Sequence, residues 1–85
     1  MDKITITSGK TFEVTNIDGG IVAHHIVDDG AVFVAMLRDN TFKAEIQYYS
    51  YDGVLLGHYP DDVHNFFGDD EVEDVKNELE KITKQ

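Results

Sequence analysis

Seven acidic side chains fall between residues 61 and 74 of this 85-residue sequence, with no Lys or Arg among them. Crowded like charges cost stability, so we consider the hypothesis that the electric field of this cluster has a function. Spaced carboxylates on a rigid helix can imitate nucleic-acid phosphates and enter the basic groove of a protein. Helix capping and solubility explain part of the cluster without any function. The acids are Asp61, Asp62, Asp69, Asp70, Glu71, Glu73 and Asp74.

Three tyrosines near this cluster are candidate anchors for a protein partner: Tyr49, Tyr51 and Tyr59. An exposed Tyr beside acid buries a large area at low entropy cost, which suits a contact surface. Packing against neighbouring strands is the alternative interpretation.

A divalent-metal site is a weaker alternative, because His58, Asp61, Asp62 and His64 lie close together in the sequence. Imidazole and carboxylate groups bind such metals, but each of these residues is also common in turns and caps. The acid-rich stretch lacks the alternating ligand spacing of a calcium-binding EF-hand loop. We therefore expect neither a metal nor another cofactor.

No arrangement of residues typical of catalysis stands out. The chain has no Cys, and the glycine pair after Asp18 lacks the Lys and Ser or Thr of a phosphate-binding loop. Ser8 and Ser50 fall in predicted turns with no adjacent His to activate them. We expect a protein that is not an enzyme.

The elements that must position these residues form one predicted α+β domain over residues 1–85. Polar and apolar residues alternate in short runs separated by turn residues, which indicates an antiparallel β-meander of five or six strands over 1–59. The segment 31–37 is apolar on both faces, so it should be central in the sheet or covered on both sides. Such a meander is expected to curl strongly and to approach a small barrel. The sharpest hairpin signal is Asp52-Gly53.

A short helical turn over 60–68 and a C-terminal amphipathic helix over 69–84 should follow the strands. Asp69 or Asp70 is the expected cap, and Asp70 with Glu73 has the spacing of a capping box. One apolar stripe recurs at three- and four-residue steps, formed by Val72, Val75, Leu79 and Ile82.

The charge is unevenly spread and excludes several kinds of partner. The formal net charge is −10; residues 1–60 contribute −4 and residues 61–85 contribute −6. Nucleic-acid phosphates and anionic membranes repel such a protein, so we expect no direct binding to either. No apolar run follows a basic stretch at the start of the sequence, and a cytoplasmic location is expected.

These observations favour a small acidic protein-binding module, an inhibitor or regulator that docks on a basic, nucleic-acid-binding protein surface. In size, charge and lack of catalytic residues it is similar to uracil-glycosylase inhibitors, anti-restriction proteins and some anti-CRISPR proteins, some of which act as nucleic-acid mimics, although no family motif is present. Two alternatives remain at this point. One is an assembly subunit that forms a homo-oligomer by pairing its apolar helix stripe with a second copy. The other is a small metal-binding domain that uses the four residues named above.

Overall fold

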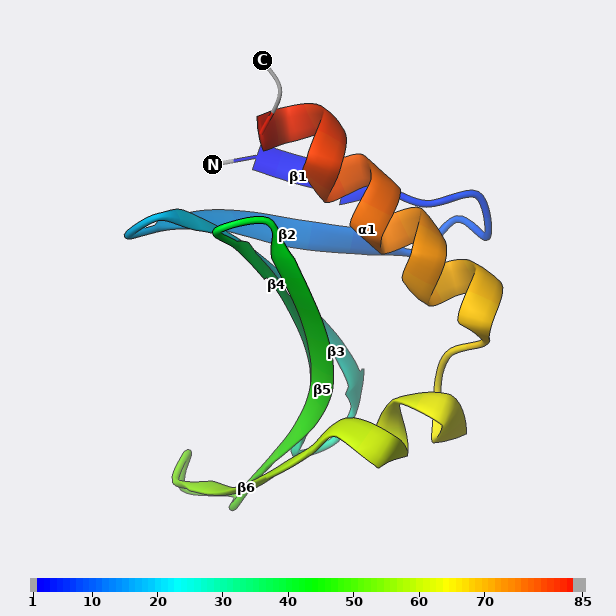
Figure 1. The fold of residues 1–85 in the computed structure, drawn as a ribbon. Coiled ribbons are helices and arrows are strands. Elements are labelled where there is room, and N and C mark those ends of the chain that lie inside the picture. The colour runs from blue at the N-terminus through cyan, green and yellow to red at the C-terminus, as the bar shows by residue number, and fades with distance from the viewer. Residues whose placement is uncertain (1, 84–85) are drawn as a thin grey trace.

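The computed structural model describes residues 2–83 and has an α+β fold, in which six antiparallel strands precede a C-terminal helix (Figure 1). Each strand pairs with the next one along the chain, so the sheet order is β1-β2-β3-β4-β5-β6. The prediction of an antiparallel meander followed by a helix is confirmed. The strands are β1 (Asp2–Thr5), β2 (Thr11–Ile17), β3 (Gly20–Asp28), β4 (Ala31–Arg38), β5 (Thr41–Tyr49) and β6 (Leu55–Tyr59).

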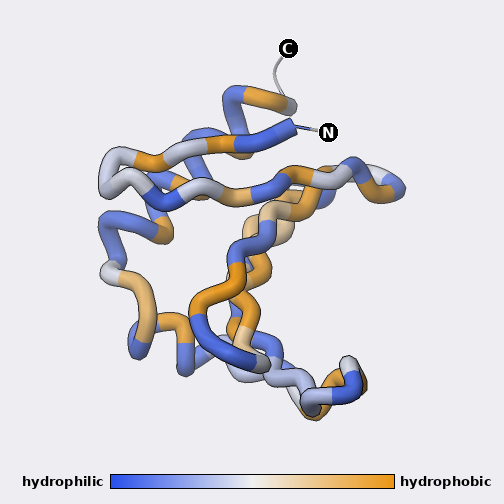
Figure 2. The backbone as a smooth tube through the Cα atoms, turned by 180° about the vertical axis from the view of Figure 1, so that it is seen from behind, coloured by the Kyte–Doolittle hydropathy of each residue, from blue (hydrophilic) through white to orange (hydrophobic). Residues whose placement is uncertain are grey.

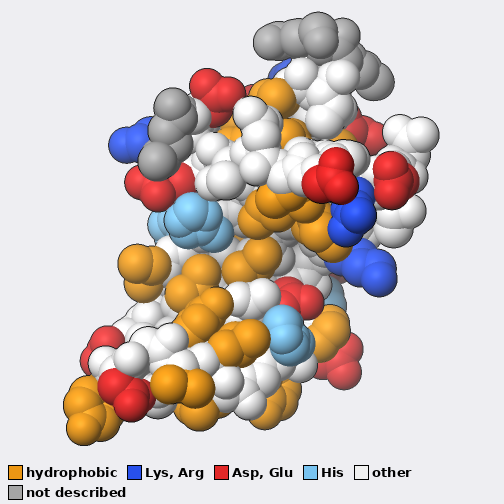
Figure 3. Space-filling view, turned by 90° about the vertical axis from the view of Figure 1, so that its left-hand side faces the viewer, with side chains coloured by type: hydrophobic (Ala, Val, Ile, Leu, Met, Phe, Trp, Pro, Cys, Tyr) orange, Lys and Arg blue, Asp and Glu red, His pale blue; other side chains and the backbone are white. Residues whose placement is uncertain are grey.

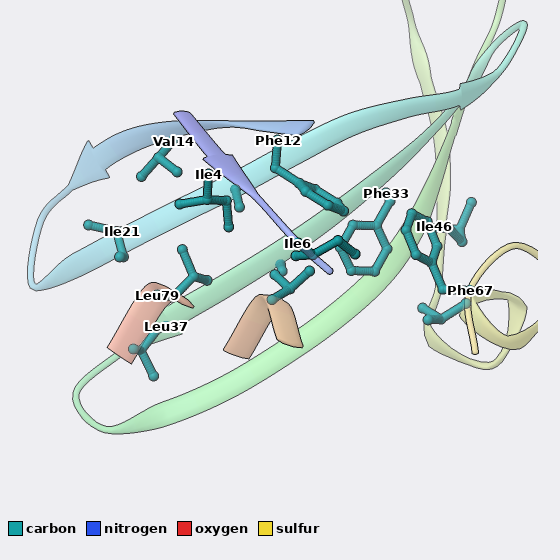
Figure 4. Close-up of a cluster of buried hydrophobic side chains, with 14 of the residues drawn as sticks. Ile4, Ile6, Phe12, Val14, Ile21, Phe33, Leu37, Ile46, Phe67 and Leu79 are labelled. Atoms are coloured by element: carbon teal, nitrogen blue, oxygen red, sulfur yellow. The ribbon is translucent and has the colours of Figure 1, made fainter. Parts of the chain in front are cut away.

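Alternation along each strand sends one set of side chains into a single core. Successive side chains of a strand point to opposite faces, so each run of alternating residues buries every second one. Figure 4 shows the buried side chains converging from strands that are distant in sequence, and Figure 2 shows that the central strands are hydrophobic. Phe12, Phe33 and Ile46 are fully buried at the centre of this core. On β4 the buried residues are Ala31, Phe33, Ala35 and Leu37.

Two helical segments cover this apolar face of the sheet. The 3₁₀ helix η1 (Pro60–Asn65) contacts β5, and the helix α1 (Asp69–Thr83) contacts β3 and β4. Val75 and Leu79 of α1 are fully buried against the sheet. The apolar stripe of α1 therefore packs on its own sheet and is not free to pair with a second copy. Residue 84, the predicted end of the helix, lies outside the described residues.

The expectation of a strongly curled, barrel-like sheet is wrong. Strands β1 and β6 lie at opposite ends of the strand order and do not pair, so the sheet stays open. A barrel buries its apolar face by closing on itself, whereas a layer of helix does the same for an open sheet. Here η1 and α1 supply that layer. Within residues 2–83, neither helix has the length and apolar character needed to cross a membrane.

The hairpin turn with positive φ at both central residues joins β4 to β5 and not β5 to β6. Asp39 and Asn40 both have positive φ, at 51° and 63°, as a two-residue type I′ turn requires. In the loop after β5, Gly53 has positive φ but Asp52 does not. The amide of Ser50 donates to the carbonyl of Val54, which closes a longer loop. The sequence signal at Asp52-Gly53 thus identified the hairpin but not its turn type.

Candidate functional site

The predicted acidic cluster lies on η1 and on the first turns of α1. Residues four apart on a helix are neighbours on its surface, so Asp69 with Glu73 and Asp70 with Asp74 form two adjacent rows. Asp61, at the first turn of η1, is exposed, as are Asp69, Asp70 and Glu73. Figure 1 shows η1 and the start of α1 next to each other on the covered side of the sheet, so the acids of these two segments belong to one region of the surface.

Phe67 holds the segment that joins η1 to α1. Its ring is almost completely buried, and its centroid lies 4.4 Å from that of Phe33 and 5.8 Å from that of Phe12. The ammonium group of Lys10 lies 5.2 Å from the centroid of the same ring. Aromatic pairs at these separations contribute beyond their buried area, so the position of the acidic helix start is tied to the core.

Glu71 is a structural member of the cluster. Its carboxylate accepts hydrogen bonds from Lys10 Nζ, from the Ser8 hydroxyl at 2.8 Å and from the Gly68 amide at 3.2 Å. The hydrogen bond from Lys10, then that from Ser8, lower the pKa of this carboxyl. The amides of Glu71 and Val72 donate to the Gly68 carbonyl, so Gly68 is the N-cap residue. The predicted cap at Asp69 or Asp70 is therefore wrong. The predicted Asp70–Glu73 capping box is wrong as well, because Glu71, three residues after Gly68, is the acid that accepts the hydrogen bond from the N-cap amide.

Two further acids have partners within the protein. Asp62 accepts a hydrogen bond of 2.8 Å from the Tyr48 hydroxyl, and this bond raises the pKa of that phenol because the carboxylate favours its protonated form. Asp69 lies 3.3 Å from His64 Nδ1, with both side chains largely exposed. The remaining four acids make no ion pair with another described residue: Asp61, Asp70, Glu73 and Asp74.

A shallow hollow of about 370 Å³ opens beside these acids, between η1, β5 and the start of α1. The exposed Asp69 and Glu73 line it together with His64. Sequence reasoning missed this hollow because its apolar residues come from three separate elements and read locally as core positions. They are Phe42, Ala44, Pro60, Val63 and Val72.

The three predicted tyrosine anchors do not share one face with the acids. Tyr59 lies beside Tyr48, at 5.3 Å between ring centroids, and is therefore close to Asp62. Tyr49 lies on the opposite face of the sheet, where its hydroxyl donates to Gln47. Tyr51 is fully exposed in the loop between β5 and β6. The tyrosines and acids that we expected to form one contact face therefore lie on different parts of the surface.

The structure also separates the proposed metal ligands. His58 pairs with Glu45 on the face of the sheet away from the helices, whereas His64 pairs with Asp69 on the covered side. Among residues 2–83, no three His, Asp or Glu side chains come close enough to hold a metal ion. The four residues that the sequence suggested as metal ligands therefore do not come together at one site.

The chain matches no protein-family model, no curated protein and no solved structure.

Proposed function

We propose that this protein is a binding module whose acidic end docks on a basic surface of another protein. The observation that carries the proposal is the hollow beside η1, where an apolar lining adjoins exposed carboxylates. An Arg or Lys side chain has the same two parts, an apolar stem and a cationic head. Its stem would lie against Val63 and Val72, and its head would reach Asp69 or Glu73.

The free acids extend this site into a wider contact surface. Asp61, Asp70 and Asp74 make no ion pair with a described residue, so their charge is available to a partner. A surface of one sign steers an oppositely charged partner and raises the association rate. A nucleic-acid-binding protein offers such a basic surface, so an inhibitor that occupies its groove is the sharpest form of the proposal. Catalysis has no part in it.

A titration with a defined basic peptide tests the docking site directly. The probe is a nonapeptide of alternating Arg and Gly, added to isotopically labelled protein at about 20 mM and at about 300 mM salt. We expect amide shifts around Ala44, Val63 and Val72 at low salt, and much smaller shifts at high salt because exposed charges are then screened. Shifts that cluster elsewhere on the molecule would contradict the assignment of the hollow.

A matched pair of variants separates this surface from the overall charge. D61K/D70K/E73K reverses three exposed acids of the cluster, and D2K/D18K/D29K reverses three exposed acids elsewhere. Both carry the same net charge, so only the first should lose the peptide and any protein captured from lysate at low salt. The inhibitor form of the proposal further requires that duplex DNA compete for the captured protein. Equal binding by the two variants would show that the charge acts without a specific site.

A further inference from the structure

The face of the sheet opposite the helices carries a continuous apolar stripe. We call it the open face. On β4, Val32, Val34 and Met36 alternate with the buried residues, and they are only half-buried. In the strand register Val22 is paired with Met36 and Ile26 with Val32, which extends the stripe onto β3. Ile26 is 71% exposed. Figure 3 shows hydrophobic side chains gathered across the middle of this face.

The sequence of β4 points to a cover that the single chain does not supply. A strand that is apolar on both faces is typical of a sheet covered on both sides. Here η1 and α1 cover one side, and among the described residues no element covers the other. A hollow of about 330 Å³ lies over the stripe, lined by Val22, Val34 and Met36 together with polar residues of β5 and β6.

The residues that point outward from the strands of the open face carry little net charge. The outward-pointing residues of its strands include two acids, Glu13 and Glu45, and three bases, Lys3, Arg38 and Lys43. A basic partner is thus attracted to the opposite side of the protein, not to this one. An apolar face with mixed charges at its margins instead suits a surface of the same composition.

We propose that the open face binds the open face of a second copy of this chain, forming a two-fold symmetric dimer. In the register, Lys43 is paired with Met36 and Glu45 with Val34, so the two charges occupy neighbouring rows. A two-fold axis that lies between these rows and perpendicular to the strands exchanges them. The row of Lys43 and Met36 in one copy then faces the row of Glu45 and Val34 in the other. Lys43 of each copy then faces Glu45 of its mate, whose carboxylate also pairs with His58 of its own chain, while Val34 and Met36 pack against each other across the axis.

The size of the open face is sufficient for a reversible dimer. Strands β3, β4 and β5 have 9, 8 and 9 residues. At about 3.3 Å per residue and about 4.8 Å between strands, the four strands from β2 to β5 present on the order of 500 Å². Complete coverage of this face in both copies would bury roughly 1,000 Å², which is the lower limit for a specific interface.

The net charge of −10 does not prevent this association. Sheets packed face to face lie about 10 Å apart, and the acidic helices form the outer layer of each copy. The two acidic clusters are therefore farther apart than the Debye length of about 8 Å at physiological salt. This dimer also leaves the proposed docking hollow exposed, so it does not depend on the proposed function.

Sedimentation measurements from about 1 µM to about 1 mM test the dimer at physiological salt. We expect a monomer–dimer equilibrium with a dissociation constant between about 1 and about 100 µM. The dimer should persist at about 500 mM salt, whereas a complex with the basic peptide should dissociate there. A chain that stays monomeric at about 1 mM, or a dimer that dissociates at high salt, would overturn the proposal.

A charge-swap experiment tests the geometry. K43E and E45K should each weaken the dimer by at least about tenfold, because two-fold symmetry repeats every like-charge contact. Mixed in equal amounts, the two variants should form a heterodimer of near wild-type affinity, since each acid then faces a Lys.

V34K should abolish dimers, and N77K, an equal charge change on the exposed face of α1, should not. Circular dichroism and thermal melting establish that each variant is folded. Failure of the mixture to dimerise, or a dimer insensitive to V34K, refutes the proposed interface.

Discussion

Glu71 lies within the acidic cluster in the sequence, but its contacts show that it stabilises the fold. Its removal tests whether it is a structural residue or a contact residue for a partner. Its carboxylate joins the turn after β1 to the start of α1 through Ser8 and Lys10, and it caps the helix at Gly68. Glu71→Ala removes all three interactions. We expect the variant to be destabilised while its binding to a basic partner is retained.

The size of the effect follows from the three contacts. Loss of a helix cap costs about 1 kcal/mol. The Ser8 hydroxyl contributes about another 1 kcal/mol. The Lys10 pair contributes about 0.5–1 kcal/mol, because the Lys10 side chain is 37% exposed and water screens the interaction. The free energy of unfolding should fall by about 2–3 kcal/mol, which lowers the Tm of a domain of this size by roughly 10–20 °C.

The dependence on pH gives a second measurement of the same contact. The pKa of Glu71 in the folded protein lies below its ordinary value, chiefly because Lys10 donates a hydrogen bond to the carboxylate. The stabilisation is therefore present at neutral pH and is lost as the pH falls through the folded-state pKa. The difference in unfolding free energy between wild type and Glu71→Gln should shrink below about pH 4.

Urea denaturation of wild type, Glu71→Ala, Lys10→Met and the double variant supplies the free energies. A double-mutant cycle isolates the coupling between the two residues, which should be about 0.5–1 kcal/mol. A Glu71→Ala variant that unfolds like wild type but fails to bind the basic peptide would contradict the structural role of Glu71. Glu71 would then be a contact residue and not a structural one.

Two further predictions concern the sheet and its contact with η1. Tyr48→Phe removes the hydroxyl that donates to Asp62, so a spectrophotometric titration should lose one phenol that ionises above the ordinary pKa. Because that pKa is raised in the folded protein, the stabilisation is present at neutral pH and lost as the pH rises; an unchanged titration would contradict the contact. Gly20→Ala should cost at least about 2 kcal/mol in urea denaturation, because its Cβ would lie 2.2 Å from the Leu37 carbonyl oxygen. A variant as stable as wild type would show that β3 and β4 do not approach this closely.

Much of the fold was predictable because it rests on local patterns. Alternation placed Ile4, Phe12 and Val14 on one face, and all three are buried in the core. The spacing of Val75 and Leu79 identified the buried side of α1 in the same way. Period-two and period-3.6 patterns report which residues share a face, and this information is contained within a few neighbouring residues.

The site was predictable only in part, because its contacts join distant segments. The sequence located the acidic cluster, but the partners of Glu71 lie 61 and 63 residues away along the chain, at Lys10 and Ser8. The hollow beside Asp69 and Glu73 likewise combines residues of β5, η1 and α1. No local spacing encodes such contacts.

Propensity, periodicity and charge are properties of neighbouring residues, so the strands, the closing helix and the concentration of acid after residue 60 follow from the order of the amino acids. Which acids are free for a partner, and whether the sheet closes, depends on contacts between segments that are distant in the sequence. The same holds for the second apolar face of β4, which no element of residues 2–83 covers. A pattern of residues specifies that a face is apolar, but what covers that face depends on how whole elements pack in space.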